Sequence, residues 1–333
     1  MPSAIHSDSS KLPAWERPAE TTHELPWAEI AVIDLSSLDE PGGKEKLAEE
    51  LRDAVQTTGF FILLRRFSTF HRKKETSPSC DVILEKEITL GTERAKQFQS
   101  GEKKVMGTEV LDNVESWNFP KYIPELAHEP HHDFFERFEA EIEDFSKHEY
   151  SSKSEDHLRY MIYRPRSESQ DALVDNSWSR AHTDFGSLTL LWSQNVAGLQ
   201  IKTKEGEWKY VPAVDGGIIC NVGDAMQFWS AGYLKSTIHR VTRPPPDQDH
   251  IHRLGLFYFV RPGNEVDIAP APSPLLERLG LVKGTQNGEV RKKVTGLQYV
   301  RERVRDYHDH TDYEDRRGKT FKVGDLEIED EAA

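Results

Sequence analysis

Cysteine is scarce in this chain, which contains only two among its 333 residues. Cys80 and Cys220 are too few to form a disulfide framework or a cysteine-rich zinc site. Long apolar runs are also missing: none approaches the roughly 20 residues that a membrane-spanning helix needs. The first residues lack the apolar core of a secretory signal. We therefore expect no membrane span and a reducing, cytoplasmic setting.

Positive charge is in short supply as well. Aspartate and glutamate number 57 against 43 lysines and arginines, which gives a formal net charge of −14. A chain with this balance is poorly suited to bind nucleic acid or an anionic membrane surface. Hydrophobic residues still make up 36% of the chain, and its length suffices for one large domain or two modest ones. We expect a single domain whose partner is neither nucleic acid nor membrane.

The first half of the chain is predicted to combine strands with helices. Residues 1–27 are polar and contain prolines, which indicates an arm on the surface. Within residues 28–157, "EIAVIDLSSL" and "TTGFFILL" are typical of strands. Between these two segments, Leu47, Leu51 and Val55 recur at helical spacing.

Two further helices and a loop are predicted in the same region. Residues 82–99 are compatible with a helix, and the basic segment 65–79 has no useful periodicity, which favours an exposed loop. The segment "HDFFERFEAEIEDFSKHEY" predicts a helix with an apolar stripe at Phe134, Phe138, Ile142 and Phe145. We interpret this stripe as core packing.

From Leu158 onward the sequence changes to short β-rich runs separated by turn residues. Residues 158–265 contain seven such runs: "RYMIY", "SLTLLW", "GLQIK", "EWKYV", "GGIICNVGDAMQFW", "STIHRV" and "RLGLFYFV". Their length and the Gly, Pro, Asn and Asp between them predict a β sandwich or barrel. In "NVGD", Gly223 indicates a turn between two strands. Residues 266–333 are predicted to form a helical tail, with helices near 273–310.

A histidine and an aspartate lie two residues apart in "SRAHTDFGSLTLLW". In an extended strand, His182 and Asp184 would point to the same face, so an imidazole and a carboxylate would meet at one point. Such a pair can hold a metal ion. The pattern is short, however, and a solvated pair at the start of a strand explains the tripeptide equally well.

A third candidate ligand lies in a second β-branched run, "LKSTIHRVTRPP". Between Asp184 and His239 lie 54 residues, enough to pass through several short strands and return. Two histidines and one carboxylate can occupy one face of an octahedral metal, an arrangement suited to non-haem Fe(II) and dioxygen chemistry. Zinc is the competing metal, although a zinc site of this kind would usually need a general base nearby.

An arginine within an apolar strand is the next candidate. Arg253 in "HRLGLFYFV" is costly to bury unless it meets an anion, and its planar guanidinium suits a carboxylate. A buried ion pair inside the protein explains it equally well. Tyr163 in "RYMIYRP" could donate its hydroxyl to the same anion, although a tyrosine in a strand more often serves packing.

Several features together resemble one enzyme family. "HTDFGSLTLL", "GLQIK", "EWKYVPAVDGGIICNVGDAMQFWS", "YLKSTIHRV" and "RLGLFYFVRP" occur in an order that resembles the Fe(II)/2-oxoglutarate-dependent dioxygenases, specifically the isopenicillin N synthase-like group. The resemblance extends from about Ile30 to Pro262 and is densest after Arg159. It implies an α+β fold whose double-stranded β-helix (jelly-roll) core is flanked by N-terminal helices and a C-terminal helix.

The resemblance also implies a set of site residues. His182, Asp184 and His239 would be the iron ligands. Arg253 would bind the distal carboxylate of 2-oxoglutarate, with Tyr163 as a helper.

A function follows from the resemblance as well. The implied enzyme hydroxylates or desaturates a small organic molecule, uses Fe(II), and takes 2-oxoglutarate and O₂ as co-substrates, with 2-oxoglutarate decarboxylated to succinate. Because the family places its variable substrate contacts before the barrel, Trp117 and Phe119 would line the substrate pocket, although core packing explains them equally well. We expect a monomer. The alternatives are an iron oxidase of the same fold that does not use 2-oxoglutarate, and a non-catalytic variant.

Three features depart from the family pattern. The usual R-x-S motif is Arg253-Leu254-Gly255 here, and the missing hydroxyl removes one hydrogen bond to the co-substrate, worth about 0.5–1.5 kcal/mol. Gly255→Ser is therefore predicted to tighten 2-oxoglutarate binding. The basic segment 65–79 replaces a short turn, and the segment 146–157 is shorter than the helical stretch usual in the family.

Overall fold

The structure, a computed structural model, describes residues 17–64, 98–99, 104–120, 153–282, 294–309, 320–323 and 326–329. The helical segments are η2 (Leu35–Ser37), α1 (Gly43–Thr57), α5 (Glu168–Ala172), α6 (Asp224–Trp229), α7 (Pro274–Arg278) and α8 (Gly296–Asp309). The strands are β1 (Ala31–Asp34), β2 (Phe60–Leu64), β3 (Phe98–Gln99), β4 (Val114–Pro120), β5 (His157–Tyr163), β6 (Ser177–His182), β7 (Leu188–Ser193), β8 (Leu199–Lys202), β9 (Trp208–Tyr210), β10 (Gly217–Val222), β11 (His239–Thr242), β12 (Arg253–Val260), β13 (Thr320–Val323) and β14 (Leu326–Glu329). Among the described residues, no helix combines the length and the apolarity needed to cross a membrane.

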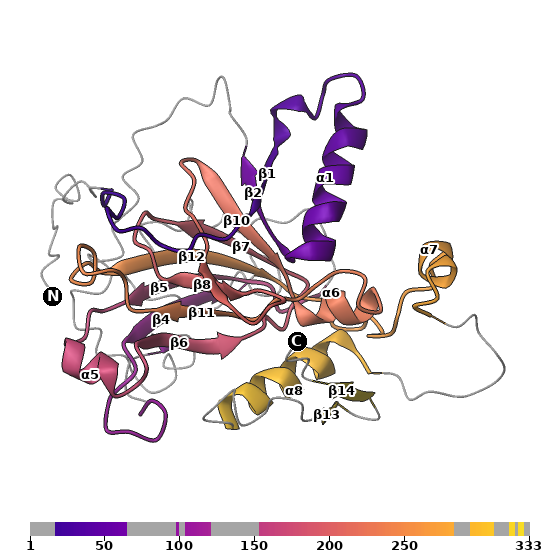
Figure 1. Ribbon diagram of the computed structural model, residues 1–333. Helices are drawn as coiled ribbons and strands as arrows, with labels where there is room; N and C mark the ends of the chain where they lie inside the picture. Colours follow the sequence, from indigo (N-terminus) through magenta and orange to yellow (C-terminus); the bar gives the residue numbers. More distant parts are fainter. Residues whose placement is uncertain are drawn as a thin grey trace, which may run out of the picture.

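Two β-sheets form the centre of the molecule (Figure 1). The larger sheet has the strand order β1-β2-β10-β7-β12-β5-β4-β3, and the smaller has the order β6-β11-β8-β9. Buried apolar side chains from both sheets form one core cluster: Phe60, Ile62, Tyr163, Leu191 and Ile219 from the larger sheet, and Trp178, Leu199, Ile201 and Val241 from the smaller. Removing these two faces from water is the main stabilising contribution to such a sandwich.

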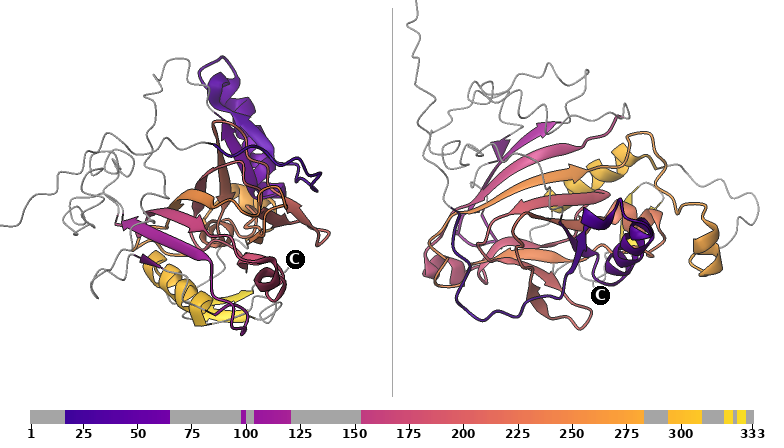
Figure 2. Two further views of the ribbon diagram at one scale, coloured as in Figure 1. Left: turned by 90° about the vertical axis from the view of Figure 1, so that its left-hand side faces the viewer. Right: turned by 90° about the horizontal axis from the view of Figure 1, so that it is seen from above.

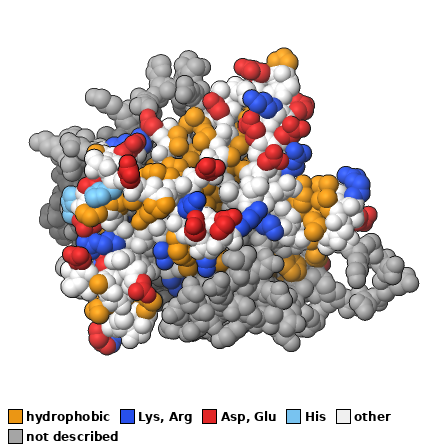
Figure 3. Space-filling model, in the orientation of Figure 1, with side chains coloured by type: hydrophobic (Ala, Val, Ile, Leu, Met, Phe, Trp, Pro, Cys, Tyr) orange, Lys and Arg blue, Asp and Glu red, His pale blue; other side chains and the backbone are white. Residues whose placement is uncertain are grey.

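Helix α1 covers the outer face of the larger sheet beside β1 and β2 (Figure 2). Leu47, Ala54 and Val55 of α1 pack with Phe61 and Cys220 in a second buried cluster, which confirms the helical spacing predicted here. Figure 3 shows acidic and basic side chains interspersed on the exposed side of α1. Burial raises the pKa of the Cys220 thiol to about 12, so this thiol is held in its unreactive protonated form.

The register of the larger sheet decides which side chains face the core. Strand β12 runs antiparallel to β5, with Arg253 opposite Tyr163 and Phe257 opposite Arg159. Residues directly opposite each other point to the same face of a sheet, and alternate residues along a strand point to opposite faces. Because Tyr163 belongs to the cluster between the sheets, these four positions lie on the inner face.

The fold differs from the sequence-based expectation in three places. Strand β6 is not predicted from the sequence, because "SWSRAH" contains no apolar run. The segment "GGIICNVGDAMQFW" forms β10 followed by α6, so Gly223 links a strand to a helix rather than two strands. A β-carbon at Gly223 would lie 2.3 Å from the carbonyl oxygen of Gly186, so this close approach of two backbones requires glycine. The C-terminal tail contains the antiparallel pair β13–β14 besides its helices.

Other sequence-based predictions fall outside the described residues. These are the loop over 65–79, the apolar stripe from Phe134 to Phe145, and most of the helix over 82–99, of which residues 98–99 form β3 instead. Most of the short segment 146–157 also lies outside them. The division of the chain at residues 27, 157 and 265 stays a prediction.

Candidate active site

The structure brings the three predicted metal ligands together between the two sheets. His182 is the last residue of β6, and it lies directly opposite His239, the first residue of β11. Asp184 follows in the loop after β6. Its Oδ1 lies 3.8 Å from Nε2 of His182 and 3.7 Å from Nε2 of His239. One ligand atom from each residue lies within 4.8 Å of the others, so a single ion can contact all three.

Backbone carbonyls set the orientation of both imidazoles. Nδ1 of His182 lies 2.8 Å from the carbonyl oxygen of Arg180, and Nδ1 of His239 lies 3.0 Å from that of Thr237. A carbonyl can only accept, so each Nδ1 carries the proton and each Nε2 presents a lone pair to the centre. Burial and the neighbouring His239 lower the pKa of His182 to about 4. His182 is therefore neutral at pH 7, as a metal ligand must be.

Asp184 is held by two donors on the inner face of the larger sheet. The Thr189 hydroxyl and the Asn221 amide both donate to Oδ2, at 2.6 Å and 2.7 Å. Burial opposes the charge of Asp184, but the two histidines and these two hydrogen bonds outweigh it and lower its pKa to about 2. Oδ1 remains directed at the histidines. Two imidazole nitrogens and one carboxylate, without sulfur, fit a divalent ion such as Fe(II).

Arg253 lies at the other end of the inner face and has a different environment. Its side chain is 1% exposed, and its guanidinium carbon lies 5.4 Å from the centroid of the Tyr163 ring. Nε and Nη1 are buried without a hydrogen-bond partner. Burial lowers the pKa of Arg253, with Tyr163 opposing the shift. A buried guanidinium with two unpaired donors is costly, and a bound carboxylate would satisfy both.

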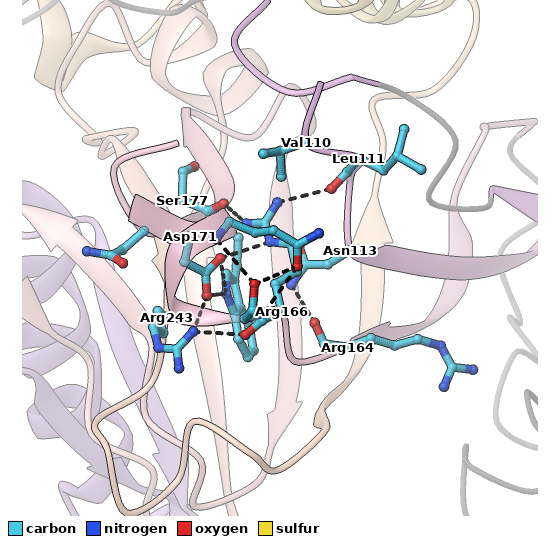
Figure 4. Close-up of polar contacts among 12 residues, drawn as sticks. Val110, Leu111, Asn113, Arg164, Arg166, Asp171, Ser177 and Arg243 are labelled. Atoms are coloured by element: carbon cyan, nitrogen blue, oxygen red, sulfur yellow. Dashed lines mark hydrogen bonds and ion pairs between the residues drawn. The ribbon is translucent and has the colours of Figure 1, made fainter. Parts of the chain in front are cut away.

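Tyr163 is supported by a buried ionic cluster around Asp171, which sequence analysis missed (Figure 4). Its ring stacks on Trp178 at 6.5 Å between centroids, and the Trp178 indole donates to Asp171 at 3.1 Å. Arg166 and Arg243 also donate to Asp171, at 2.8 Å and 2.6 Å. The capping pattern "SESQ" before Asp171 could have located the short helix, but not these long-range partners.

The two predicted substrate contacts lie on β4, and the register argues against this role for Trp117. Trp117 is opposite Tyr160 and so points to the outer face of the larger sheet, away from Asp184. Phe119 lies two residues farther along β4, and its side chain is outside the described residues. The inner-face position between them is Asn118, whose Oδ1 accepts a hydrogen bond from Nε of Arg159 at 2.6 Å. Residues alternate between the two faces along a strand, so Arg159 shares the inner face with Tyr163, and the pairing of β4 with β5 adds Asn118.

Gly255 lies on the inner face between Arg253 and Phe257. A β-carbon at this position would lie 2.5 Å from Cε2 of Phe257 and 3.5 Å from Cδ1 of Leu191. The aromatic ring therefore occupies the space beside Arg253 where the resemblance places a serine hydroxyl. The prediction that Gly255→Ser would tighten binding is not supported by this packing.

Comparisons with known proteins agree with this geometry. Residues 154–262 match the model of the 2OG-Fe(II) oxygenase superfamily. A UPF0676 protein of Schizosaccharomyces pombe is 35% identical over 131 residues, which cover 38% of this chain and 39% of that protein. 1-Aminocyclopropane-1-carboxylate oxidase 1 of Malus domestica is 26% identical over 283 residues, which cover 74% of this chain and 84% of that protein.

A solved structure shows the same fold. A full-length Neurospora crassa protein in complex with alpha-KG (2-oxoglutarate) superimposes with a TM-score of 0.64 at 21% identity, covering 84% of this chain and 96% of that chain. This likeness confirms the predicted jelly-roll fold. The family model, the relatives and the fold together confirm the resemblance inferred from the motifs. Residues 154–262 therefore carry the match to the 2OG-Fe(II) oxygenase superfamily, and the comparisons support a dioxygenase similar to the isopenicillin N synthase-like type.

Proposed function

We propose that this protein is an Fe(II)- and 2-oxoglutarate-dependent oxygenase that hydroxylates or desaturates a small organic molecule. The observation that carries the proposal is the presence of two incomplete sites between the two sheets. Three ligand residues converge on one point, and a buried guanidinium with two unpaired donors lies on the inner face of the larger sheet. A dicarboxylate that binds a metal at one end and an arginine at the other would complete both.

Each residue of the site has a distinct role in this proposal. His182, Asp184 and His239 hold Fe(II), which supplies the activation of O₂ that is coupled to decarboxylation of 2-oxoglutarate. Arg253 binds the distal carboxylate of the co-substrate, and the Tyr163 ring packs against that guanidinium. The apolar cluster between the sheets excludes water from the space around them.

Arg159 and Asn118 replace Trp117 as the candidate substrate contacts. Both lie on the inner face, and the guanidinium carbon of Arg159 lies 5.1 Å from the centroid of the Phe259 ring. Phe259 pairs with Thr189, which donates to Asp184, so this wall adjoins the ligand set.

A succinate-release assay tests the proposal. Purified protein with Fe(II), ascorbate and 2-oxoglutarate is screened against a panel of metabolites that includes 1-aminocyclopropane-1-carboxylate. We expect succinate formation that one or more compounds stimulate. Substrate oxidation without succinate would instead indicate the iron oxidase of the same fold.

A binding experiment distinguishes an enzyme lacking its substrate from a non-catalytic variant. Mn(II) and 2-oxoglutarate are added together and separately while the unfolding midpoint is followed. Ligands that bind only the folded state raise this midpoint, so we expect a larger increase for the pair than for Mn(II) alone. No increase with either ligand would favour the non-catalytic variant.

The proposal extends to a cytoplasmic monomer with no nucleic-acid or membrane partner. The low cysteine count and the acidic composition are compatible with it. Light scattering on the purified protein tests the monomer.

A further inference from the structure

Asp224, the first residue of α6, contacts both chain segments that carry the candidate metal ligands. Its Oδ2 accepts a hydrogen bond at 3.0 Å from the hydroxyl of Thr183, the residue between His182 and Asp184. Its Oδ1 accepts one at 2.8 Å from the hydroxyl of Ser236, three residues before His239. Its backbone N–H donates at 2.7 Å to the carbonyl oxygen of Asp184. One residue outside the ligand set thus connects the segments of all three ligands.

The C-terminal helix supplies the charge partner of this carboxylate. Arg303 of α8 is 4% exposed, and its Nη2 donates to Oδ2 of Asp224. Its guanidinium carbon also lies 5.0 Å from the centroid of the Phe185 ring, so the same side chain covers the residue after Asp184. Ala225 of α6 and Tyr299 of α8 belong to one buried cluster. Arg303 of α8 therefore lies next to the loop after β6 that carries Asp184.

The loop that carries Asp184 needs such support, because it lies beyond the paired residues of β6. His182 ends β6 and Asp184 lies beyond the strand. A buried carboxylate–guanidinium pair is not by itself strong evidence for stability, because desolvation offsets much of the attraction. A pair that bonds to the segments of metal ligands fixes their positions, and ligand atoms displaced by about 0.5 Å lose productive geometry.

We propose that Asp224 and Arg303 are positioning residues, an Asp224–Arg303 clamp through which α8 holds the metal-ligand segments in binding geometry. This inference rests on the proposed function, because it assigns the three residues as metal ligands. It assigns to the C-terminal helix a role in metal affinity, in addition to covering the apolar side of α6.

Titration of the apo-protein with Co(II), followed by visible absorption, tests the clamp. The variants are Arg303→Met and Asp224→Asn. The matched control is Arg301→Met. Arg301 lies two residues before Arg303 on α8 and forms an exposed ion pair with Glu155. Replacing residues that orient metal ligands costs about 10- to 100-fold in metal affinity. We expect a weakening of about tenfold or more in each clamp variant, a changed Co(II) spectrum, and wild-type affinity in the control.

The double variant Asp224→Asn/Arg303→Met distinguishes a loss of metal affinity from a loss of folding stability. It leaves no unpaired buried charge, so its apo unfolding midpoint should recover toward that of the wild type. Its Co(II) affinity should stay low, because the connection between the segments is not restored. A clamp variant with a lower midpoint but wild-type Co(II) affinity and spectrum would overturn the inference and leave a purely structural ion pair. Wild-type protein that binds no Co(II) would instead overturn the proposed function, and the inference with it.

Discussion

The two ends of the inner face differ in how their polar groups are satisfied. At the ligand end, Asp184 receives two hydrogen bonds and both imidazoles have a carbonyl partner. At the other end, two donors of Arg253 have none. The first end is preorganised by the protein alone, whereas the second is completed only by a ligand. Substitutions at the two ends should therefore have opposite effects on the stability of the empty protein.

The largest effect is expected at the preorganised end. Asp184→Ala removes the only carboxylate of the ligand set and leaves Thr189 and Asn221 without their acceptor, so metal binding and turnover should be abolished. Because two buried donors lose their partner, the unfolding midpoint of the apo-protein should also fall. Calorimetric titration with Mn(II) and a thermal scan measure both effects. The exposed Asp39→Asn variant is the control, and near-normal turnover by Asp184→Ala would overturn the ligand assignment.

The opposite sign is expected at Arg253. Arg253→Leu should raise the KM for 2-oxoglutarate about ten- to a hundredfold, because a charge-assisted pair is worth roughly 1.5–3 kcal/mol. It should also raise the midpoint of the apo-protein, since an unpaired buried charge is replaced by an apolar side chain. Arg278→Leu, an exposed substitution on α7, should change neither quantity. If 2-oxoglutarate kinetics were unchanged in Arg253→Leu, the arginine would have a structural role only.

The candidate metal ligands and Arg253 could be predicted from the sequence, whereas the residues that support them could not. His182, Asp184, His239 and Arg253 stand in short motifs within or beside β-rich runs, which makes them candidates, and the resemblance implies their roles. Pattern alone could not decide between a chance H-x-D pair and a site, because the three-residue set forms only when β6 pairs with β11.

The missed residues act through contacts that are distant along the chain. Asp224 looked like part of a turn, because "DAMQFW" is too short for a helical period to be recognised. Arg303 lies 79 residues from it, and helical periodicity indicates a face but not a partner. Trp117 is a candidate because the family places its variable substrate contacts before the barrel, whereas the strand register determines which face it occupies.

A smaller effect is expected from pH, through His157 on the inner face. Burial, Arg159 and Arg261 hold its pKa well below the usual 6.5. The unfolded chain therefore takes up a proton below about pH 6.5 that the folded protein does not, and stability falls as the pH falls. One such group contributes up to about 1.4 kcal/mol of unfolding free energy per pH unit. Chemical denaturation between pH 7 and 5 should show a weaker pH dependence for His157→Gln than for wild type, while the exposed His250→Gln should match wild type.

The smallest effect is expected on 2-oxoglutarate affinity, from substitution of Gly255 beside Arg253. A serine there would add a hydroxyl next to Arg253, but its β-carbon would lie 2.5 Å from the Phe257 ring, so the ring must move. We expect Gly255→Ser to weaken 2-oxoglutarate binding by less than about tenfold, since the new hydrogen bond partly offsets the cost of overpacking.

Gly255→Ala separates these two contributions, because it adds the β-carbon without the hydroxyl. Calorimetric titration of the Mn(II)-loaded variants should rank their affinity for 2-oxoglutarate as wild type, then serine, then alanine. Combining Gly255→Ser with Phe257→Leu should remove the clash and bring the affinity above that of Phe257→Leu alone. Tighter binding by Gly255→Ser alone would mean that the ring moves at little cost, and that this end is less rigid than its packing indicates.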